Sequence, residues 1–301
     1  MLSKDLNIGF IGIGKMGKAL ALALASHDYR VPACYTRSHT SPAEFNYLLP
    51  RCVITNTPQE VLDQTDLVFI TIPDDFIQSY VQDLVVNENQ AIVHCSGSLP
   101  RSILSNANHQ ARFTGMFHPY QTLAGIDSSE AAAERLSGIT FAIDAEGWLL
   151  DQLVDFGESL DSRTIHVPSS DLGIYHSSAV LTCGFLVTLL HCAMSLWEAM
   201  GHNKDDAMKA ILPLAKSTLS NIENSGVLPS MTGPIYRGDI VTIEKHISSL
   251  VARTPEIVDV YTSLFQASLP IAQQLGADSS TISAFETLIK DTFKRRSKCA
   301  R

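Results

Sequence analysis

Hydrophobic and polar residues alternate in two different patterns, and the change between them falls near residue 168. Before that point, short apolar runs alternate with stretches that have the composition of amphipathic or buried helices. This alternation of strand and helix is typical of a doubly wound parallel sheet with helices on both faces. We expect strands over residues 7–12, 31–36, 53–56, 67–72, 91–94, 113–117, 139–143 and 164–167, and helices over 15–26, from 58, from 74 and over 146–160.

After Pro168 the strand signals stop and only helical periodicity remains. A long, mostly apolar helix is predicted over 171–200, followed by helices over 204–224, 238–251, 255–275 and 279–294. A chain of 301 residues agrees with about two domains. We therefore predict an α/β class chain, with an α/β domain over 1–168 and an all-helical domain over 169–301.

One segment has the length and composition of a membrane span. Residues 179–197 contain no Asp, Glu, Lys or Arg and are long enough to cross a bilayer. The segment nevertheless includes Thr182, His191 and Ser195. We expect a buried helix of the second domain and no association with a membrane.

Composition narrows the possible functions. The formal net charge of −9 argues against non-specific binding of nucleic acid, and the basic residues of 294–298 are expected at a solvated helix end. The six cysteines form no CxxC pair and no His/Cys spacing typical of zinc, so we expect no metal site. Buried free thiols and a first stretch of 25 residues without a signal-peptide pattern favour the reducing cytoplasm.

A glycine-rich turn carries the clearest chemistry. The segment Gly12-Ile13-Gly14-Lys15-Met16-Gly17 follows a predicted strand and opens a predicted helix, which is the setting of a dinucleotide-binding loop. Gly12 permits the tight turn, Gly14 lets a pyrophosphate approach the backbone, and Gly17 lets the helix pack closely on the strand. The helix N-terminus offers unpaired N–H groups to the phosphates. We predict that all six residues line the cofactor in a Rossmann domain.

The end of the second strand predicts which cofactor is bound. NAD-specific sites place an acidic residue there, whereas this chain has Thr36-Arg37-Ser38. A guanidinium and two hydroxyls suit the 2′-phosphate of NADP. We predict NADP as the cofactor, with the alternative that Arg37 points to solvent.

Further site residues are expected where later strands end. Ile72 and Pro73 end one strand and should lie near the ribose and nicotinamide of the cofactor. Ser96 follows the next strand and is suited to hydrogen-bond either nicotinamide or substrate. A role for Ser96 as a helix N-cap is equally open.

Several motifs, in this order, resemble one family. They are the glycine loop, Thr71-Ile72-Pro73-Asp74-Asp75, His94-Cys95-Ser96-Gly97, Phe117-His118-Pro119-Tyr120-Gln121-Thr122, Tyr175-His176 and Thr232-Gly233-Pro234-Ile235-Tyr236-Arg237-Gly238-Asp239. The chain resembles a family of Rossmann-like proteins assigned as oxidoreductases, whose C-terminal helical domain is of unknown function. That family is similar to pyrroline-5-carboxylate reductases, F420-dependent NADP reductases and ketopantoate reductases. The resemblance implies NADP-linked hydride transfer, a homodimer formed through the helical domain, and ketopantoate as one specific substrate.

The chain departs from the family at two positions. Leu172 and Gly173 stand where relatives often have a Lys before the Tyr-His pair, and Gly184 stands where they often have an Asn. In ketopantoate reductases a Lys and an Asn polarise the keto group. The departures leave open a different substrate, a different acid or lost activity.

Reduction of a carbonyl or imine needs a proton donor near the site of hydride transfer. We predict that His118, in a loop at a strand end, and His176, near the start of the long helix, are the catalytic residues, with His176 the better acid. A structural role between the domains is the alternative for each. His191, on an apolar helix face, is expected to be a core histidine.

Three further residues are candidates for binding substrate. Gln121 and Thr122 are suited to orient a carboxylate or amide, or else to cap their own loop. Arg237 is suited to bind a substrate carboxylate through two hydrogen bonds. Pairing of Arg237 with Asp239 or Glu244 is an equal alternative, and Asp239 is expected to cap the helix that follows it.

The sequence therefore predicts an NADPH-dependent reductase of a small keto or imino acid. Because the Lys and Asn are missing, an alternative is a catalytically silent NADP-binding sensor or a dimeric scaffold. A third possibility is an NADP reductase coupled to a flavin or F420, which would consume NADPH only when a deazaflavin is added.

Overall fold

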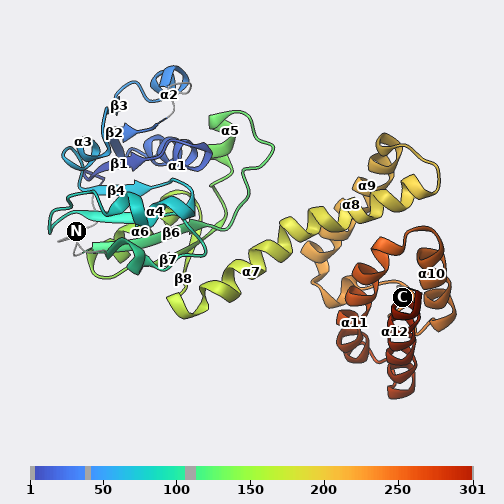
Figure 1. Ribbon diagram of the computed structural model, residues 1–301. Coiled ribbons are helices and arrows are strands. Elements are labelled where there is room, and N and C mark those ends of the chain that lie inside the picture. The colour runs from blue at the N-terminus through green and yellow to red at the C-terminus, as the bar shows by residue number, and fades with distance from the viewer. Residues whose placement is uncertain (1–3, 38–41, 106–112, 300–301) are drawn as a thin grey trace. The chain divides into compact units, whose positions relative to one another are not determined.

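The computed structural model describes residues 4–37, 42–105 and 113–299. It divides into two compact units, Met1–Gly184 and Phe185–Arg301, which are described separately below (Figure 1). The last strand ends at His166, so strands give way to helices where the hydrophobic pattern predicts the change. The first compact unit runs beyond that point and includes the first helix after the strands.

An eight-stranded sheet forms the centre of the first unit, with strand order β3-β2-β1-β4-β5-β6-β7-β8. All neighbouring strands are parallel except β6 and β7. The doubly wound α/β fold predicted from sequence is confirmed, with this one antiparallel pair added. The strands are β1 (Asn7–Ile11), β2 (Arg30–Tyr35), β3 (Val53–Ile54), β4 (Leu67–Ile70), β5 (Ala91–His94), β6 (Phe113–Pro119), β7 (Thr140–Asp144) and β8 (Arg163–His166).

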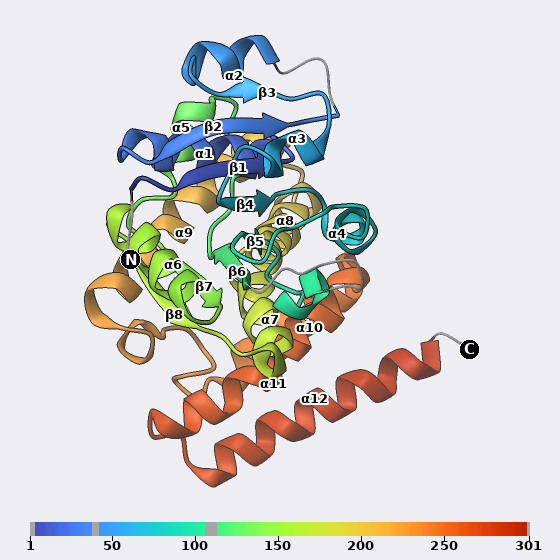
Figure 2. The ribbon, with the colours of Figure 1, turned by 90° about the vertical axis from the view of Figure 1, so that its left-hand side faces the viewer.

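Successive residues of a strand point to opposite faces of the sheet. Apolar side chains therefore emerge on both faces, and helices cover each face. One face packs under α1 (Lys15–Ser26), α5 (Ser129–Glu134) and α6 (Trp148–Ser159). The other packs under α3 (Pro58–Leu62), α4 (Asp74–Val81) and the 3-10 turn η1 (Arg101–Ser105). The short helices α2 (Pro42–Leu48) and α5 were not predicted; α5 lies beside α1 (Figures 1 and 2). The fully buried phenylalanines of the core on the first face are Phe10, Phe45, Phe69, Phe117, Phe141 and Phe156.

The antiparallel pair determines which strand ends share an edge. Beyond β6 the chain passes through α5 and returns, and the Tyr120 N–H donates to the Thr140 carbonyl at 2.8 Å. Strands β1, β4, β5 and β6 therefore end at one edge of the sheet. Asp144, which ends β7, lies instead opposite Met116 in the middle of β6.

Helices of the second unit enclose a separate core. Its members are Ile243, Ile247, Phe265, Leu269, Phe285 and Ile289. The main helices are α8 (Gly184–Ala199), α9 (Lys204–Ser225), α10 (Ile240–Arg253), α11 (Val258–Gln274) and α12 (Ser279–Cys299), with short 3-10 turns η3 (Leu228–Ser230) and η4 (Pro255–Ile257). Asp239 caps α10 by accepting the Thr242 N–H at 3.0 Å, as predicted.

The long apolar helix is not buried within the chain, so that expectation is wrong. It consists of α7 (Leu172–Thr182), preceded by the turn η2 (Ser169–Asp171), and of α8 beyond Cys183. No residue of α8 is buried, and His191, expected in the core, is exposed. Within the described residues, the stretch 169–199 is also long and apolar enough to cross a membrane by length and composition. Only Cys192 and Leu196 of α8 pack against the small buried cluster of Leu250, Ile257 and Val258 within the described residues.

Candidate functional site

The glycine loop has the geometry of a phosphate-binding turn. Gly12 adopts a positive φ of 98° and donates its N–H to the Tyr35 carbonyl at 2.8 Å, which ties the loop to β2. The Thr71 hydroxyl donates to the Gly12 carbonyl from the end of β4. A Cβ on Gly17 would overlap the Gly12 carbonyl oxygen and lie 2.6 Å from the Thr71 hydroxyl. Only glycine therefore fits at position 17.

Gly14 differs because a Cβ there would meet no atom within 4 Å. It is the N-cap of α1 and makes no side-chain capping bond, so the first N–H groups of the helix have no partner from a cap. Ile13 is buried, Met16 packs against the core, and Lys15 is exposed at the first turn. Open space in front of uncapped N–H groups is what a phosphate requires.

At the end of β2, a cationic side chain lies over an aromatic ring of α4. The Arg37 guanidinium lies over the Phe76 ring of α4, 5.6 Å from its centroid. Burial, followed by a hydrogen bond with Tyr35, raises the pKa of the Tyr80 hydroxyl. Arg37 is thus exposed but held against α4, whereas Ser38 lies outside the described residues and Thr36 is half-buried.

Loops after β4 and β5 are joined by one carboxylate. Asp74, at the start of α4, accepts hydrogen bonds from the Ser96 hydroxyl at 2.5 Å and from the Ser98 hydroxyl at 2.9 Å. The Ser96 oxygen also accepts the N–H groups of Ser98 and Leu99, each at 3.2 Å. Ser96 thus stabilises its own loop and caps no helix, since η1 begins only at Arg101. Ile72 packs on the sheet and Pro73 is the exposed N-cap of α4, both at this edge.

His94, the last residue of β5, is fully buried. Its Nδ1 accepts the Ser96 N–H at 3.2 Å, and the described residues offer no hydrogen-bond partner to its Nε2. Burial lowers the pKa of His94 to about 4, an effect that the Pro100 carbonyl and Asp74 only partly oppose. His94 is consequently a neutral ring beneath the Ser96 loop at pH 7.

His118 and His176, the two predicted catalytic residues, are brought together. Their ring centroids lie 6.3 Å apart. The His118 ring packs on Gly97, where a Cβ would lie 2.8 Å from its Nε2. Burial, and then the nearby His176, lower the pKa of His118 to about 4. His176 has a buried Nδ1 without a hydrogen-bond partner.

Tyr175 is the residue that sequence reasoning missed. Its hydroxyl lies 2.6 Å from His118 Nδ1, and burial raises its pKa above the ordinary value. Tyr120 packs beside it, with ring centroids 5.5 Å apart, and the Tyr120 hydroxyl lies 3.0 Å from the Ser178 hydroxyl. The Tyr175-His176 pair in the sequence was a signal, but only the fold shows that its tyrosine meets His118.

The remaining predicted substrate residues lie in two places. Gln121 accepts the Thr122 N–H at 2.8 Å, and Thr122 accepts the Ala124 N–H at 3.3 Å, so both cap their own loop in the first unit. Arg237 is exposed before α10 in the helical unit. Hydrogen bonds from Thr242, and to a smaller degree the charge of Arg237, lower the pKa of Asp239.

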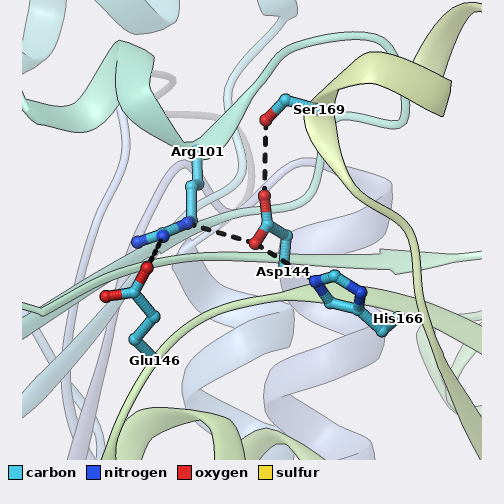
Figure 3. Close-up of polar contacts among 5 residues, drawn as sticks. All are labelled: Arg101, Asp144, Glu146, His166 and Ser169. Carbon is cyan, nitrogen blue, oxygen red and sulfur yellow. Dashed lines mark hydrogen bonds and ion pairs between the residues drawn. The ribbon is translucent and has the colours of Figure 1, made fainter.

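A second polar cluster is centred on Asp144 (Figure 3). The Arg101 Nε lies 3.1 Å from Asp144, and the same guanidinium also pairs with Glu146. The Ser169 hydroxyl donates to the other oxygen of Asp144 at 3.4 Å, and His166 Nε2 lies 3.6 Å from Asp144. Because Arg101 follows the Ser96 loop and Ser169 precedes α7, Asp144 connects the two segments that carry the site.

Gly14 and Gly17 provide a matched pair of variants. Gly17→Ala is expected to lower the melting temperature by several degrees, because its methyl group overlaps the Gly12 carbonyl. Gly14→Ala should keep the wild-type melting temperature but weaken NADPH binding about tenfold or more, since its methyl group enters the open space. Thermal unfolding and fluorescence titration measure both. Equal effects of the two variants on stability would contradict this description of the loop.

Burial of His94 predicts acid sensitivity. Its folded pKa of about 4 lies below the unfolded value of 6.5, so the unfolded chain binds more protons between these pH values. Stability should fall as the pH decreases through this window, with roughly 2 kcal/mol from His94. We expect His94→Asn to flatten the dependence of the unfolding free energy on pH between 6.5 and 4.5. An unchanged slope in denaturant titrations would show that His94 does not contribute.

Comparisons with known proteins agree with this division of the chain. Residues 1–119 match the Rossmann-like domain family, and residues 139–268 match the family described as a domain of unknown function, DUF2520. No curated protein matches. Three solved structures illustrate the fold that this chain shares.

A protein provisionally assigned as an NADP oxidoreductase in Bacteroides fragilis is 24% identical, with a TM-score of 0.68 over 88% of this chain and 98% of that one. A Thermotoga maritima protein is 20% identical, with a TM-score of 0.70 over 89% and 98%. The 1-pyrroline-5-carboxylate reductase of Streptococcus pyogenes is 17% identical, with a TM-score of 0.57 over 96% and 99%. The chain thus combines a Rossmann-like domain with a DUF2520 domain and shares the fold of these proteins.

Proposed function

We propose that this protein is an NADP(H)-dependent oxidoreductase that reduces a small keto or imino acid by hydride transfer. The observation that carries the proposal is the glycine loop, where Gly14 opens onto free space before the uncapped start of α1. The His118–Tyr175 pair at the end of β6 supplies polar groups at the same edge of the sheet. Ketopantoate and cyclic imino acids are the first substrates to test.

The choice of NADP rests on Arg37 and on the absence of an acidic residue after β2. A guanidinium held against Phe76 is partly ordered before the ligand arrives, which reduces the entropy lost on binding a 2′-phosphate. The Bacteroides fragilis protein, which shares the fold, is assigned as an NADP oxidoreductase. Ile72 and Pro73 would lie against the ribose and nicotinamide.

When bound, the cofactor supplies the hydride; the protein must orient the acceptor and provide a proton. Ser96, Gln121, Thr122 and Arg237 are the proposed substrate contacts, through hydroxyl, amide and guanidinium groups. His118 and His176 are the proposed acid–base residues. His118 is neutral at pH 7. It would therefore transfer a proton as a neutral imidazole and not as a positively charged imidazolium. The likeness to a pyrroline-5-carboxylate reductase favours an imino acid.

A catalytically silent NADP-binding protein is the second candidate, and Leu172 favours it. Relatives often have a Lys near this position, whereas here Leu172 is 3% exposed and packs with Met116, Ala142 and Val167. That side chain cannot polarise a carbonyl group. Consumption of NADPH in the presence of any keto or imino acid would exclude the silent alternative.

Arg37 provides the test of cofactor choice. We expect Arg37→Ala to weaken NADPH binding about tenfold or more and to leave NADH binding unchanged, because only NADPH has the 2′-phosphate. Fluorescence of the bound nicotinamide measures both affinities. Arg51→Ala is the control, because it changes the net charge by the same amount. Arg51 is exposed and precedes β3, so it lies at the edge of the sheet opposite to Arg37. Equal loss of NADPH affinity in both variants would remove the specific role of Arg37.

The proposed assembly is a homodimer formed through the apolar helix. Ile174, Leu181 and Val187 have 78%, 62% and 64% of their surfaces exposed within the single chain. Large apolar side chains this exposed along one helical stretch suit an interface with another protein surface. A second copy offers an equally apolar surface, so pairing would bury both at once.

Size-exclusion chromatography with light scattering tests the dimer. Val187→Asp places a charge in the proposed interface and should convert a dimeric wild type into a monomer. Lys216→Asp alters an exposed polar position on α9 and should leave the dimer intact. A wild-type protein that is already monomeric at micromolar concentration would refute the proposed assembly.

A further inference from the structure

We infer that Tyr175 is the group that donates the proton during reduction, and that His118 returns a proton to it. This inference rests on the proposed reductase function and deepens it. Its basis is the 2.6 Å contact between the Tyr175 hydroxyl and His118 Nδ1. The two rings meet edge to face, with centroids 5.5 Å apart and an interplanar angle of 87°.

Both partners are oriented by contacts on several sides. The His118 ring lies so close to Gly97 that a Cβ there would be 2.8 Å from its Nε2. Tyr120 packs on Tyr175 from a second direction. Tyr175 also packs on the small core that includes Met116 and Leu172. A general acid needs this kind of fixed orientation.

Asp144 contributes to the position of Tyr175 from a distance. It accepts a hydrogen bond from Ser169, directly before α7, and pairs with Arg101, directly after the Ser96 loop (Figure 3). The start of α7 and the loop beside His118 are therefore tied to one carboxylate. Asp144 is a positioning residue in this scheme.

Tyr175 suits the role better than either histidine. His118 is neutral at pH 7, and its Nδ1 is already engaged with the tyrosine. His176 has a buried Nδ1 for which the described residues supply no hydrogen-bond partner, so its orientation is less well determined than that of Tyr175. The phenol remains protonated at every physiological pH, since burial raises its pKa.

The proposed step is balanced in atoms and charge. The carbonyl or imine carbon gains a C–H bond from the hydride that bound NADPH would supply, and the electron pair of the double bond moves to oxygen or nitrogen. The Tyr175 O–H bond breaks and its proton joins that atom. His118, protonated on Nδ1, passes this proton to the phenolate while water protonates Nε2, and proton exchange with water then returns His118 to its Nδ1–H tautomer. The products are the alcohol or amine, NADP⁺ and hydroxide, which the buffer neutralises.

Both members of the His118–Tyr175 pair have ionisable neighbours. His94, His176 and Asp74 influence His118, and Tyr120 influences Tyr175. His94 is neutral at pH 7 for the same reason as His118. Because His118 stays neutral between pH 6 and 8, its titration should not lower the rate of reduction in this range.

Three variants test the assignment in the full-length protein, with ketopantoate and pyrroline-5-carboxylate as substrates. Tyr175→Phe should lower kcat by about a hundredfold or more and leave NADPH affinity unchanged. His118→Asn, which retains a polar atom near Nδ1, should cause a smaller loss and reduce the solvent deuterium isotope effect. His176→Asn should cause a smaller loss than Tyr175→Phe, and His202→Asn, at an exposed histidine outside the site, should leave kcat unchanged. A larger loss for His176→Asn than for Tyr175→Phe would overturn the assignment.

A second measurement separates this inference from the reductase proposal. Nitrogen-15 NMR of the NADPH-bound protein reports which His118 nitrogen carries the proton. A proton on Nδ1 whose signal shifts in Tyr175→Phe supports the pair, whereas a proton on Nε2 contradicts the relay even in an active enzyme. A wild type that binds NADPH yet reduces neither substrate would instead count against the reductase proposal, and with it against the donor role.

Discussion

The parallel direction of β1, β4, β5 and β6 is the constraint on which the rest of the site depends. Because these neighbouring strands end at one edge, the glycine loop, Asp74, Ser96 and His118 are delivered to the same side of the sheet. Contacts across strand ends then join them. Thr71 hydrogen-bonds the Gly12 carbonyl, Asp74 accepts from Ser96, and His118 packs on Gly97.

Burial determines the acid–base chemistry that this edge can support. His94 and His118 both lose water on folding, and each therefore favours its neutral form at physiological pH. A pair of neutral groups, imidazole and phenol, then remains where a charged acid was expected. Such a pair moves protons without creating a buried charge before the reaction begins, which would cost several kcal/mol.

Attachment of α7 to the sheet involves few interactions, and each has a separate physical origin. Val167 and Leu172 bury apolar surface, Tyr175 and Ser178 make hydrogen bonds, and Ser169 contacts the carboxylate of Asp144. The outer surface of this helix and of α8 remains apolar and exposed in a single chain. The same helix that carries Tyr175 thus presents the surface proposed to bind a second copy.

Local sequence determined the features that depend on neighbouring residues. The glycine spacing of the first loop, the strand and helix periods, the capping role of Asp239 and the change of pattern near residue 168 all follow from short-range rules, and the fold agrees with them. His118 and His176 were both predicted as catalytic residues, from a strand-end loop and from the start of the long helix, and their ring centroids lie 6.3 Å apart.

Only the tertiary structure decided what depends on contacts between distant segments. The antiparallel direction of β7, the link from Asp144 to both Arg101 and Ser169, and the pairing of Tyr175 with His118 join residues far apart in sequence. Hydrophobic composition indicated that the 171–200 helix is apolar, but it could not show whether this chain alone covers it. Composition records the tendency of a residue to leave water, whereas burial also requires that other parts of the chain have apolar surface left to contact it.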